Sequence, residues 1–248
     1  MSAVYILWLR QLKRYLRSRA RLLGSLGQPL LFLIALGFGF GPIFEKAGGG
    51  NYIQFLAPGI IAMSILFTAI FSGMEIIWDK QFGFLKETLV APVSRFSIMI
   101  GRTLGGATVA VFQGLLVFLI AMLIGFRPDN LVMLPVAFIF IILIALFFTA
   151  LGTAIASVLE DMQGFHLIMS FLVMPIFFLS GAIFPLANLP RAIEFISTIN
   201  PLSYGIDGLR WALVNSIHFS LLADFFILTI GVIVLISIGS YLFSKIQI

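Results

Sequence analysis

The chain has 248 residues, of which 61% are hydrophobic and 10% charged, and its net charge is +5. A soluble domain carries about a quarter charged residues, so this composition excludes a water-facing globule and indicates a multi-span membrane protein. The absence of cysteine excludes disulfides and thiolate chemistry. Because the apolar residues come in blocks and not in strict alternation, the predicted fold class is an all-α membrane protein.

The first 27 residues predict an amphipathic helix at the membrane surface. In a helix over residues 3–24, Tyr5, Trp8 and Leu12 share an apolar face. The adjoining face carries the basic residues Arg10, Lys13, Arg14, Arg17 and Arg21. This pattern is typical of an interfacial helix whose cations meet anionic head groups, each contributing about 1 kcal/mol. Basic residues before a first span are also the usual signal for an inside N-terminus, and the two interpretations are compatible.

Six transmembrane helices are predicted from the apolar runs that follow. Five of them cover residues 29–44, 52–77, 97–124, 131–158 and 221–243, and another follows Gly164 and ends near Phe184. We expect Pro29 in the first turn of the first span, where its missing amide donor costs little.

Two details of these spans concern packing and charge. Gly101 and Gly105 stand four residues apart and form a small face that lets another helix approach closely, without identifying that helix. Glu75 and Asp79 lie at the inner end of the second span, next to a polar stretch, so we expect that they need not be buried.

A polar interruption over residues 78–96 separates the second and third spans. It predicts a short helix with Phe82, Leu85 and Leu89 on one face, ended by Pro92, which lacks an amide donor. A short amphipathic helix held between two spans has a shape suited to docking on another protein at the membrane surface. An ordinary polar loop that turns the chain around is the alternative.

Residues 185–220 are divided by three prolines into pieces too short to cross a membrane. Residues 189–199 and 201–215 each predict a short helix with charged residues among apolar ones. We expect these two helices to be re-entrant or to lie on the outer leaflet, because full exposure of their apolar side chains to water is costly. A plain external loop is the alternative.

The distribution of basic residues predicts the orientation. With an inside N-terminus, eleven basic residues lie on the inner side of the membrane and four on the outer side. We therefore expect a multi-pass protein of the cell membrane, with both termini and the 78–96 segment in the cytoplasm. The whole chain, residues 1–248, would form a single membrane domain.

The sequence lacks the residues that several kinds of chemistry require. There is no GxxxxGK[ST] loop, so the chain is predicted neither to bind ATP in the P-loop manner nor to be an enzyme. His166 and His218 lie far apart and predict neither a metal site nor a general base. No soluble module offers a basic patch for nucleic acid. Acidic residues are few, and none is predicted in the middle of a span. Because ion-coupled carriers usually need ionisable groups within the membrane, we expect that the energy for transport comes from elsewhere or that transport is passive.

Three segments, taken together and in order, resemble the type-2 ABC exporter permeases. They are residues 84–95 (FLKETLVAPVSR), residues 52–60 (YIQFLAPGI), and residues 200–204 (NPLSY) with Asp207, Leu209 and Arg210. The resemblance covers essentially the whole chain. The subgroup that it resembles most includes bacterial and archaeal permeases for hydrophobic drugs, lipo-oligosaccharides and polysaccharides.

The resemblance implies roles for several residues. Contacts with a cytoplasmic ATPase subunit would be made by the N-terminal helix and by Phe82, Phe84, Leu85, Lys86, Glu87, Leu89, Pro92, Arg95, Glu160 and Asp161. An outer gate would include Pro201, Tyr204, Asp207 and Arg210. The first, second and fifth spans would line the substrate route. The working unit would contain two permease chains and two ATPase chains, with MgATP on the ATPase and no cofactor in this chain.

The leading hypothesis is the membrane subunit of an ATP-driven exporter for a hydrophobic, amphiphilic or lipid-linked substrate. A passive channel or carrier would need no ATPase, and a membrane scaffold would recruit another enzyme without moving a substrate. The missing intramembrane charges disfavour the carrier, and the outer re-entrant region has no obvious purpose in a scaffold.

Overall fold

The computed structural model describes residues 3–90, 92–186 and 190–245, without the side chains of residues 19–22, 86, 87 and 89. These residues form helices and connections and contain no strand. The helices are α1 (Ala3–Arg17), α2 (Arg19–Lys46), α3 (Tyr52–Ser72), α4 (Met74–Gln81), α5 (Phe84–Val90), α6 (Arg95–Ile124), η1 (Leu131–Met133), α7 (Leu134–Val158), α8 (Met162–Phe178), α9 (Arg191–Ile199), α10 (Pro201–Val214) and α11 (Leu221–Ser244).

Five helical segments of the described chain are long and apolar enough to cross a membrane. They are Leu23–Lys46, Tyr52–Gln81, Arg95–Ile124, Leu131–Val158 and Leu221–Ser244, and each corresponds to a predicted span. Helix α8 has 17 residues, which gives a length of about 26 Å at 1.5 Å per residue, below the ~30 Å of a hydrocarbon core. The prediction that this span ends near Phe184 is wrong, since turns begin after Phe178. The count of six spans stays a prediction.

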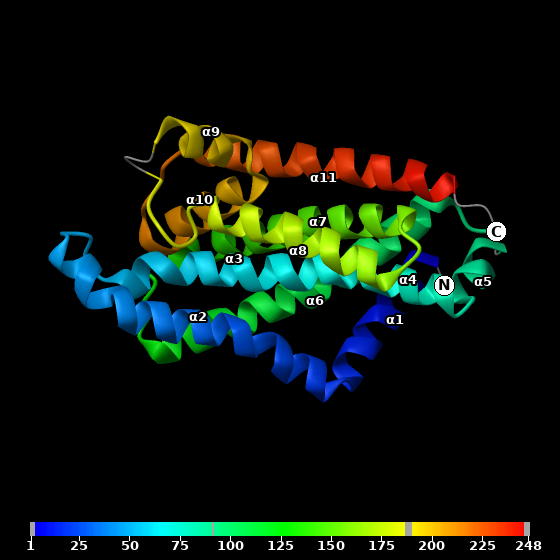
Figure 1. The fold of residues 1–248 in the computed structure, drawn as a ribbon, viewed down its shortest axis with the longest axis horizontal. Coiled ribbons are helices and arrows are strands. Elements are labelled where there is room, and N and C mark those ends of the chain that lie inside the picture. The colour runs from blue at the N-terminus through cyan, green and yellow to red at the C-terminus, as the bar shows by residue number, and fades with distance from the viewer. Residues whose placement is uncertain (1–2, 91, 187–189, 246–248) are drawn as a thin grey trace.

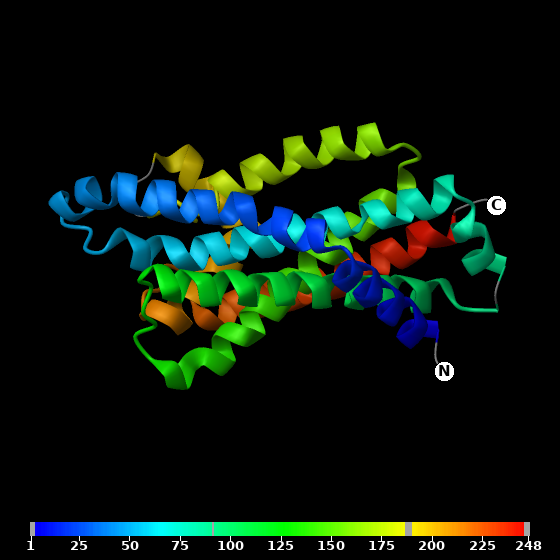
Figure 2. The ribbon, with the colours of Figure 1, turned by 90° about the horizontal axis from the view of Figure 1, so that it is seen from below.

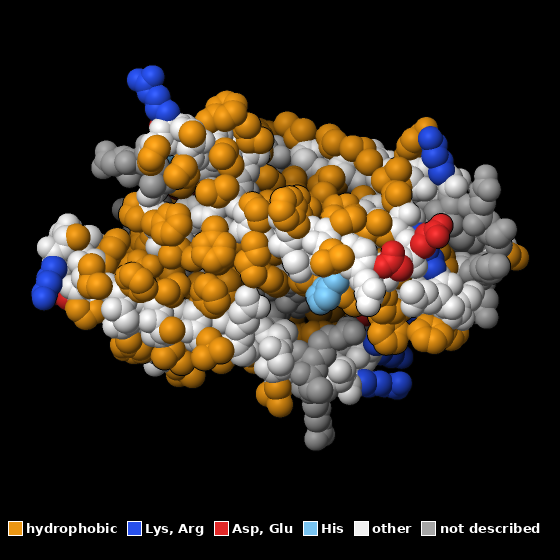
Figure 3. Space-filling model, in the orientation of Figure 1, with side chains coloured by type: hydrophobic (Ala, Val, Ile, Leu, Met, Phe, Trp, Pro, Cys, Tyr) orange, Lys and Arg blue, Asp and Glu red, His pale blue; other side chains and the backbone are white. Residues whose placement is uncertain are grey.

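The long helices run along one axis of the molecule, as Figures 1 and 2 show. One end holds α5, the beginning of α1 and the end of α11, and we call it the α5 end. The opposite end holds α9 and α10 and is called the α9 end. Figure 3 shows one side, where hydrophobic side chains cover most of the surface and charged ones lie toward the two ends. This distribution fits a membrane-crossing body.

The segment Tyr52–Gln81 forms the centre of the bundle. Its most apolar stretch is 72% buried inside the protein, against 17% for the spans in α2 and α11. The close packing around it depends on glycine. A Cβ atom at Gly73 would collide with the carbonyl oxygen of Gly152, and one at Gly152 would collide with that of Ile70. The backbones of α3, α4 and α7 therefore touch, and Gly73 marks the break between α3 and α4.

The N-terminal helix packs differently from the prediction. The helix expected over residues 3–24 breaks at Ser18, and α2 begins at Arg19, so Pro29 lies inside α2 and not in its first turn. Helix α1 lies on α6, where Trp8 Nε1 donates to Thr108 Oγ1 at 2.9 Å. Tyr15 Oη donates to the Gln113 side chain at 2.7 Å. The break lets α1 make these contacts while α2 takes another direction, visible in Figure 2.

The partner of the glycine face in α6 is α1. A Cβ atom at Gly101 would lie 3.0 Å from the Cβ of Leu7 and 3.2 Å from the Cα of Val4, and one at Gly105 would lie 2.9 Å from the Cβ of Gln11. The predicted close approach is confirmed, and its partner is a helix that the sequence assigned to the membrane surface.

Candidate functional site

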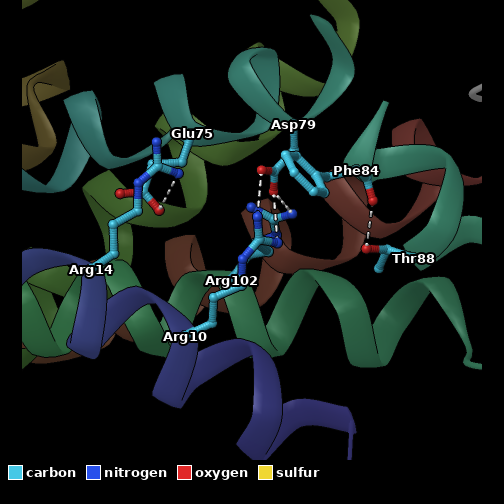
Figure 4. A network of polar contacts seen from close by, with 7 residues as sticks. All are labelled: Arg10, Arg14, Glu75, Asp79, Phe84, Thr88 and Arg102. Atoms are coloured by element: carbon cyan, nitrogen blue, oxygen red, sulfur yellow. Dashed lines mark hydrogen bonds and ion pairs between the residues drawn. The ribbon is translucent and has the colours of Figure 1, made fainter. Parts of the chain in front are cut away.

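A cluster of buried charges joins three helices near the α5 end (Figure 4). Asp79 of α4 accepts two hydrogen bonds from Arg10 of α1, at 3.1 and 2.7 Å. It also accepts one from Arg102 of α6. Asp79 and Arg102 are 2% and 3% exposed. Because a buried charge without a counter-ion is strongly destabilising, this cluster holds α1, α4 and α6 in one arrangement.

A second ion pair extends the cluster along α1 and α4. The Arg14 guanidinium lies 4.0 Å from a carboxylate oxygen of Glu75, and Glu75 is buried. Arg10 and Arg14 are four residues apart, as are Glu75 and Asp79, so each pair projects from one helix face. Since Arg10 pairs with Asp79 and Arg14 with Glu75, α1 and α4 run antiparallel along this contact.

Two predictions need correction here. Glu75 and Asp79 are buried, although their position next to a polar stretch predicted that they need not be. Arg10 and Arg14 bind these carboxylates, whereas the sequence predicted that they meet lipid head groups. The signal was the matching four-residue spacing of basic and acidic residues in the two segments. Lys13 and Arg17 are exposed on α1, and the side chain of Arg21 lies outside the described residues.

The predicted helix in the 78–96 segment is confirmed as α5, which ends at Val90, ahead of Pro92. It follows a turn at Gly83, whose φ of +79° favours glycine. Leu85 is buried, and the ring of Phe84 lies 5.7 Å from the guanidinium carbon of Arg10. Helix α5 is therefore connected to the buried charge cluster, as Figure 4 shows.

The predicted shared face of this helix is wrong for one residue. Phe82 precedes the turn and is 63% exposed, whereas Leu85 is 2% exposed. The ring of Phe82 lies 5.7 Å from that of Trp78 in α4. Arg95 is the first residue of α6. The side chains of Lys86, Glu87 and Leu89 lie outside the described residues.

Lys80 connects the two segments for which ATPase contacts were predicted. Its Nζ donates to the carbonyl oxygens of Ser157 at 2.6 Å and Leu159 at 2.8 Å, at the C-terminal end of α7. A cation is favourable there because the last carbonyls of a helix lack partners and carry partial negative charge. Glu160 follows and is exposed, and Asp161 caps α8 by accepting from the Gly164 amide at 2.5 Å. Sequence reasoning missed this role of Lys80.

The residues predicted to form an outer gate all lie on α10, at the α9 end. Pro201 begins this helix, and Tyr204 donates to the Thr198 carbonyl. Asp207 accepts from the amides of His218 and Phe219, at 2.8 and 2.7 Å. This carboxylate therefore fixes the turn between α10 and α11.

Arg210, like Asp207, makes its polar contacts within the protein. It is 7% exposed and donates to the Gly181 carbonyl at 3.0 Å. Its guanidinium carbon lies 4.1 Å from the centre of the Phe55 ring. The side chain thus joins α10 to α3 and to the turn after α8.

An apolar cavity of about 410 Å³ lies at the C-terminal half of α2, between α2, the start of α3 and the end of α8. These elements correspond to the first, second and fifth predicted spans. The residues that line the cavity are Phe32, Leu36, Phe40, Ile43, Phe44, Ala47, Tyr52, Phe178, Ile183, Phe184 and Pro185. Tyr52 is anchored there because its hydroxyl donates to the Ile183 carbonyl at 2.9 Å.

Membrane-length helices, an apolar surface and charges gathered toward the two ends define a multi-pass helical membrane protein. The sequence model of the family described as ABC-2 type transporter matches residues 2–214. The chain therefore belongs to the ABC-2 type transporter family and is a transport permease of that type.

Curated relatives support the same family. A transport permease, ycf38, of Cyanophora paradoxa is 31% identical, with 99% of this chain and 89% of the relative aligned. Nodulation protein J of Rhizobium leguminosarum bv. trifolii is 30% identical, over 83% of this chain and 76% of the relative. Nodulation protein J of Sinorhizobium fredii is 28% identical, over 86% of each chain.

Proposed function

We propose that this permease is the membrane subunit of an ATP-driven exporter and that a separate ATPase binds its α5 end. The observation that carries this proposal is the linkage of α5, α1, α4, α6 and α7 through Phe84, Asp79 and Lys80. A partner that moves α5 would move these helices together. Since α4 continues the central segment Tyr52–Gln81, such a movement reaches the core of the bundle.

The surface of the α5 end suits a protein partner. Phe82, Phe84 and Val90 are large apolar side chains with exposed fractions of 63%, 50% and 74%. Exposed apolar groups beside charged ones are typical of an interaction site. Glu160 lies exposed on the neighbouring α7–α8 connection. The partner would be a cytoplasmic ABC ATPase in two copies, and the MgATP would belong to it.

The substrate would be hydrophobic, amphiphilic or lipid-linked and would leave the cytoplasm or inner leaflet. Support comes from the apolar cavity between α2, α3 and α8 and from the exposed apolar side chains of α2 and α8. A second permease copy facing these helices would complete the route, with α9 and α10 as its outer gate. Both termini would be cytoplasmic, and α8 would be a short sixth span.

Cysteine cross-linking tests the ATPase partner, and the cysteine-free chain gives no background. Single cysteines replace Phe84, Thr88 or Glu160 at the α5 end, and Phe195, which is 65% exposed on α9, provides the matched control. We expect the first three to cross-link an ATP-binding polypeptide in native membranes and the control not to do so. Absence of that product in all three, in membranes where the chain is folded, would contradict the proposal. Substrate flux through vesicles that hold this chain alone would instead support a channel.

A further inference from the structure

A second cavity, of about 370 Å³, lies between α1, α2, α3, α4 and α6. Its volume is within the usual range of ~300–1,000 Å³ for ligand pockets. Unlike the apolar cavity, it has polar side chains in its wall beside aromatic ones. Those used in the argument are Gln11, Thr68, Ser72, Glu75, Phe67 and Phe71.

Three side chains of the polar wall offer hydrogen-bond acceptors. The hydroxyl of Ser72 donates to the Ala69 carbonyl of its own helix at 2.6 Å, so its remaining capacity is to accept. Gln11 is 5% exposed, and its Oε1 has no hydrogen-bond partner among the described residues. The carboxylate of Glu75 only accepts. A buried acceptor without a donor is costly, so a ligand that fits this wall brings N–H or O–H groups.

The charges beside the cavity favour one kind of donor. Glu75 lines the cavity, and the Arg14 guanidinium lies 4.0 Å from its carboxylate. A negative and a positive group thus stand next to each other. A ligand with an ammonium and a phosphate can place the ammonium near Glu75 and the phosphate near Arg14. An anionic head group without an ammonium would meet Glu75 unfavourably.

The aromatic wall lies farther from the α5 end. Phe67 and Phe71 stack along α3, with ring centres 6.3 Å apart and planes 21° apart. Phe67 stands near the middle of the segment Tyr52–Gln81, and Glu75 stands nearer to its end. The charged side chain of the wall, Glu75, therefore lies toward the α5 end, whereas the hydroxyl residues Ser64 and Thr68 stand at the level of the aromatic rings. A phospholipid of the leaflet at the α5 end likewise places its charged head group toward that end and its acyl chains toward the middle of the span.

We propose that this cavity binds a phospholipid with a primary ammonium head group. The ammonium shares its three N–H donors among the acceptors of Gln11, Thr68, Ser72 and Glu75, and an acyl chain lies on Phe67 and Phe71. Because the cavity has walls from α1 and α2 as well as α3, the lipid braces the N-terminal helix pair against the central segment. This inference goes beyond the proposed export function and does not require the ATPase.

A methylation series of lipids tests the proposal. The full chain is placed in nanodiscs of phosphatidylcholine that also hold phosphatidylethanolamine, its N-methyl form or its N,N-dimethyl form, all with the same acyl chains. The series keeps the net charge and removes one donor at each step. We expect the rise in thermal midpoint to fall at each methylation. Affinity should decline at least about tenfold from the ethanolamine to the choline head group, because hydrogen bonds to charged groups are the stronger ones.

Two variants locate the effect. Thr68→Val and Ser72→Ala remove an acceptor with little change in volume, and Thr229→Val is the matched control. The Thr229 hydroxyl is exposed on α11 and bonds only to the Phe225 carbonyl of its own helix, at 2.7 Å. We expect the first two variants to lose most of the stabilisation by phosphatidylethanolamine. The control should keep all of it.

Three results would overturn the proposal. The first is equal stabilisation by all members of the series. The second is a full response of both cavity variants. The third is equal stabilisation by soluble glycerophosphoethanolamine, which would assign the cavity to a water-soluble ligand. A cavity variant that fails to fold leaves the wild-type series to decide.

Discussion

Asp79 is the residue on which the charge cluster depends, because among the described residues it alone forms an ion pair with Arg102, which is 3% exposed. We expect Asp79→Asn to lower the stability of the purified chain by about 3 kcal/mol or more, the cost of leaving a buried charge unpaired. Arg102→Met should cost less, since Asp79 keeps two hydrogen bonds from the partly exposed Arg10. Thermal unfolding in nanodiscs measures both effects.

The double variant tests whether the unpaired charge of Arg102 causes the loss of stability in Asp79→Asn. Asp79→Asn with Arg102→Met removes both buried partners, and we expect it to be more stable than Asp79→Asn alone. Arg191→Gln, at an exposed position on α9, is a control expected within about 0.5 kcal/mol of the wild type. A double variant that loses the sum of the two single effects would show that the pair does not interact.

Helix α1 depends on two glycines of α6 for its position. A side chain at Gly105 would meet Gln11, so we expect Gly105→Val to separate α1 from α6 and to let α1 unfold locally, which trypsin requires for cleavage. Limited trypsin cleavage after Lys13 and Arg17 should become several times faster. Gly39→Val is the matched control, because a Cβ atom there has no neighbour within 4 Å. Equal cleavage of the two variants would contradict this role of Gly105.

The elements were largely predictable, and their partners were not. The limits of α7, α10 and α11 follow from apolar runs and from Pro201 at a helix start, so the structure agrees within a few residues. The break at Ser18 lacks a local stop signal and exists because α1 packs on α6. The end of α8 at Phe178 was also missed, since the sequence remains apolar beyond it.

The candidate site shows the same limit. The residue pattern of the 78–96 segment predicted α5, and the resemblance of residues 84–95 implied its role. The attachment of α5 through Arg10 and Phe84 depends on contacts between distant segments. Lys80 appeared in the sequence only as one inner basic residue. Its interaction with the carbonyls at the end of α7 requires two spans to be neighbours, which hydropathy does not specify.

At the scale of the whole molecule, we expect the apolar surface to face two environments, a second permease chain and lipid. Helices α2 and α8 border the apolar cavity and expose large side chains, among them Phe38 at 59% and Phe171 at 84%. Helix α11 also exposes apolar residues, including Ile233 at 60%, but it does not border that cavity. If a second permease completes the route, as proposed, it covers α2 and α8, and lipid covers α11.

Cysteine pairs distinguish these surfaces. We expect Phe38→Cys and Phe171→Cys to give cross-linked products that contain two permease chains in native membranes. Ile233→Cys, on an equally apolar helix face, should give such products several times less efficiently, because lipid separates α11 from the second copy. Equal yields from all three positions would indicate random collision in the membrane. A higher yield from Ile233 would place the second permease on α11 and move the substrate route away from the apolar cavity.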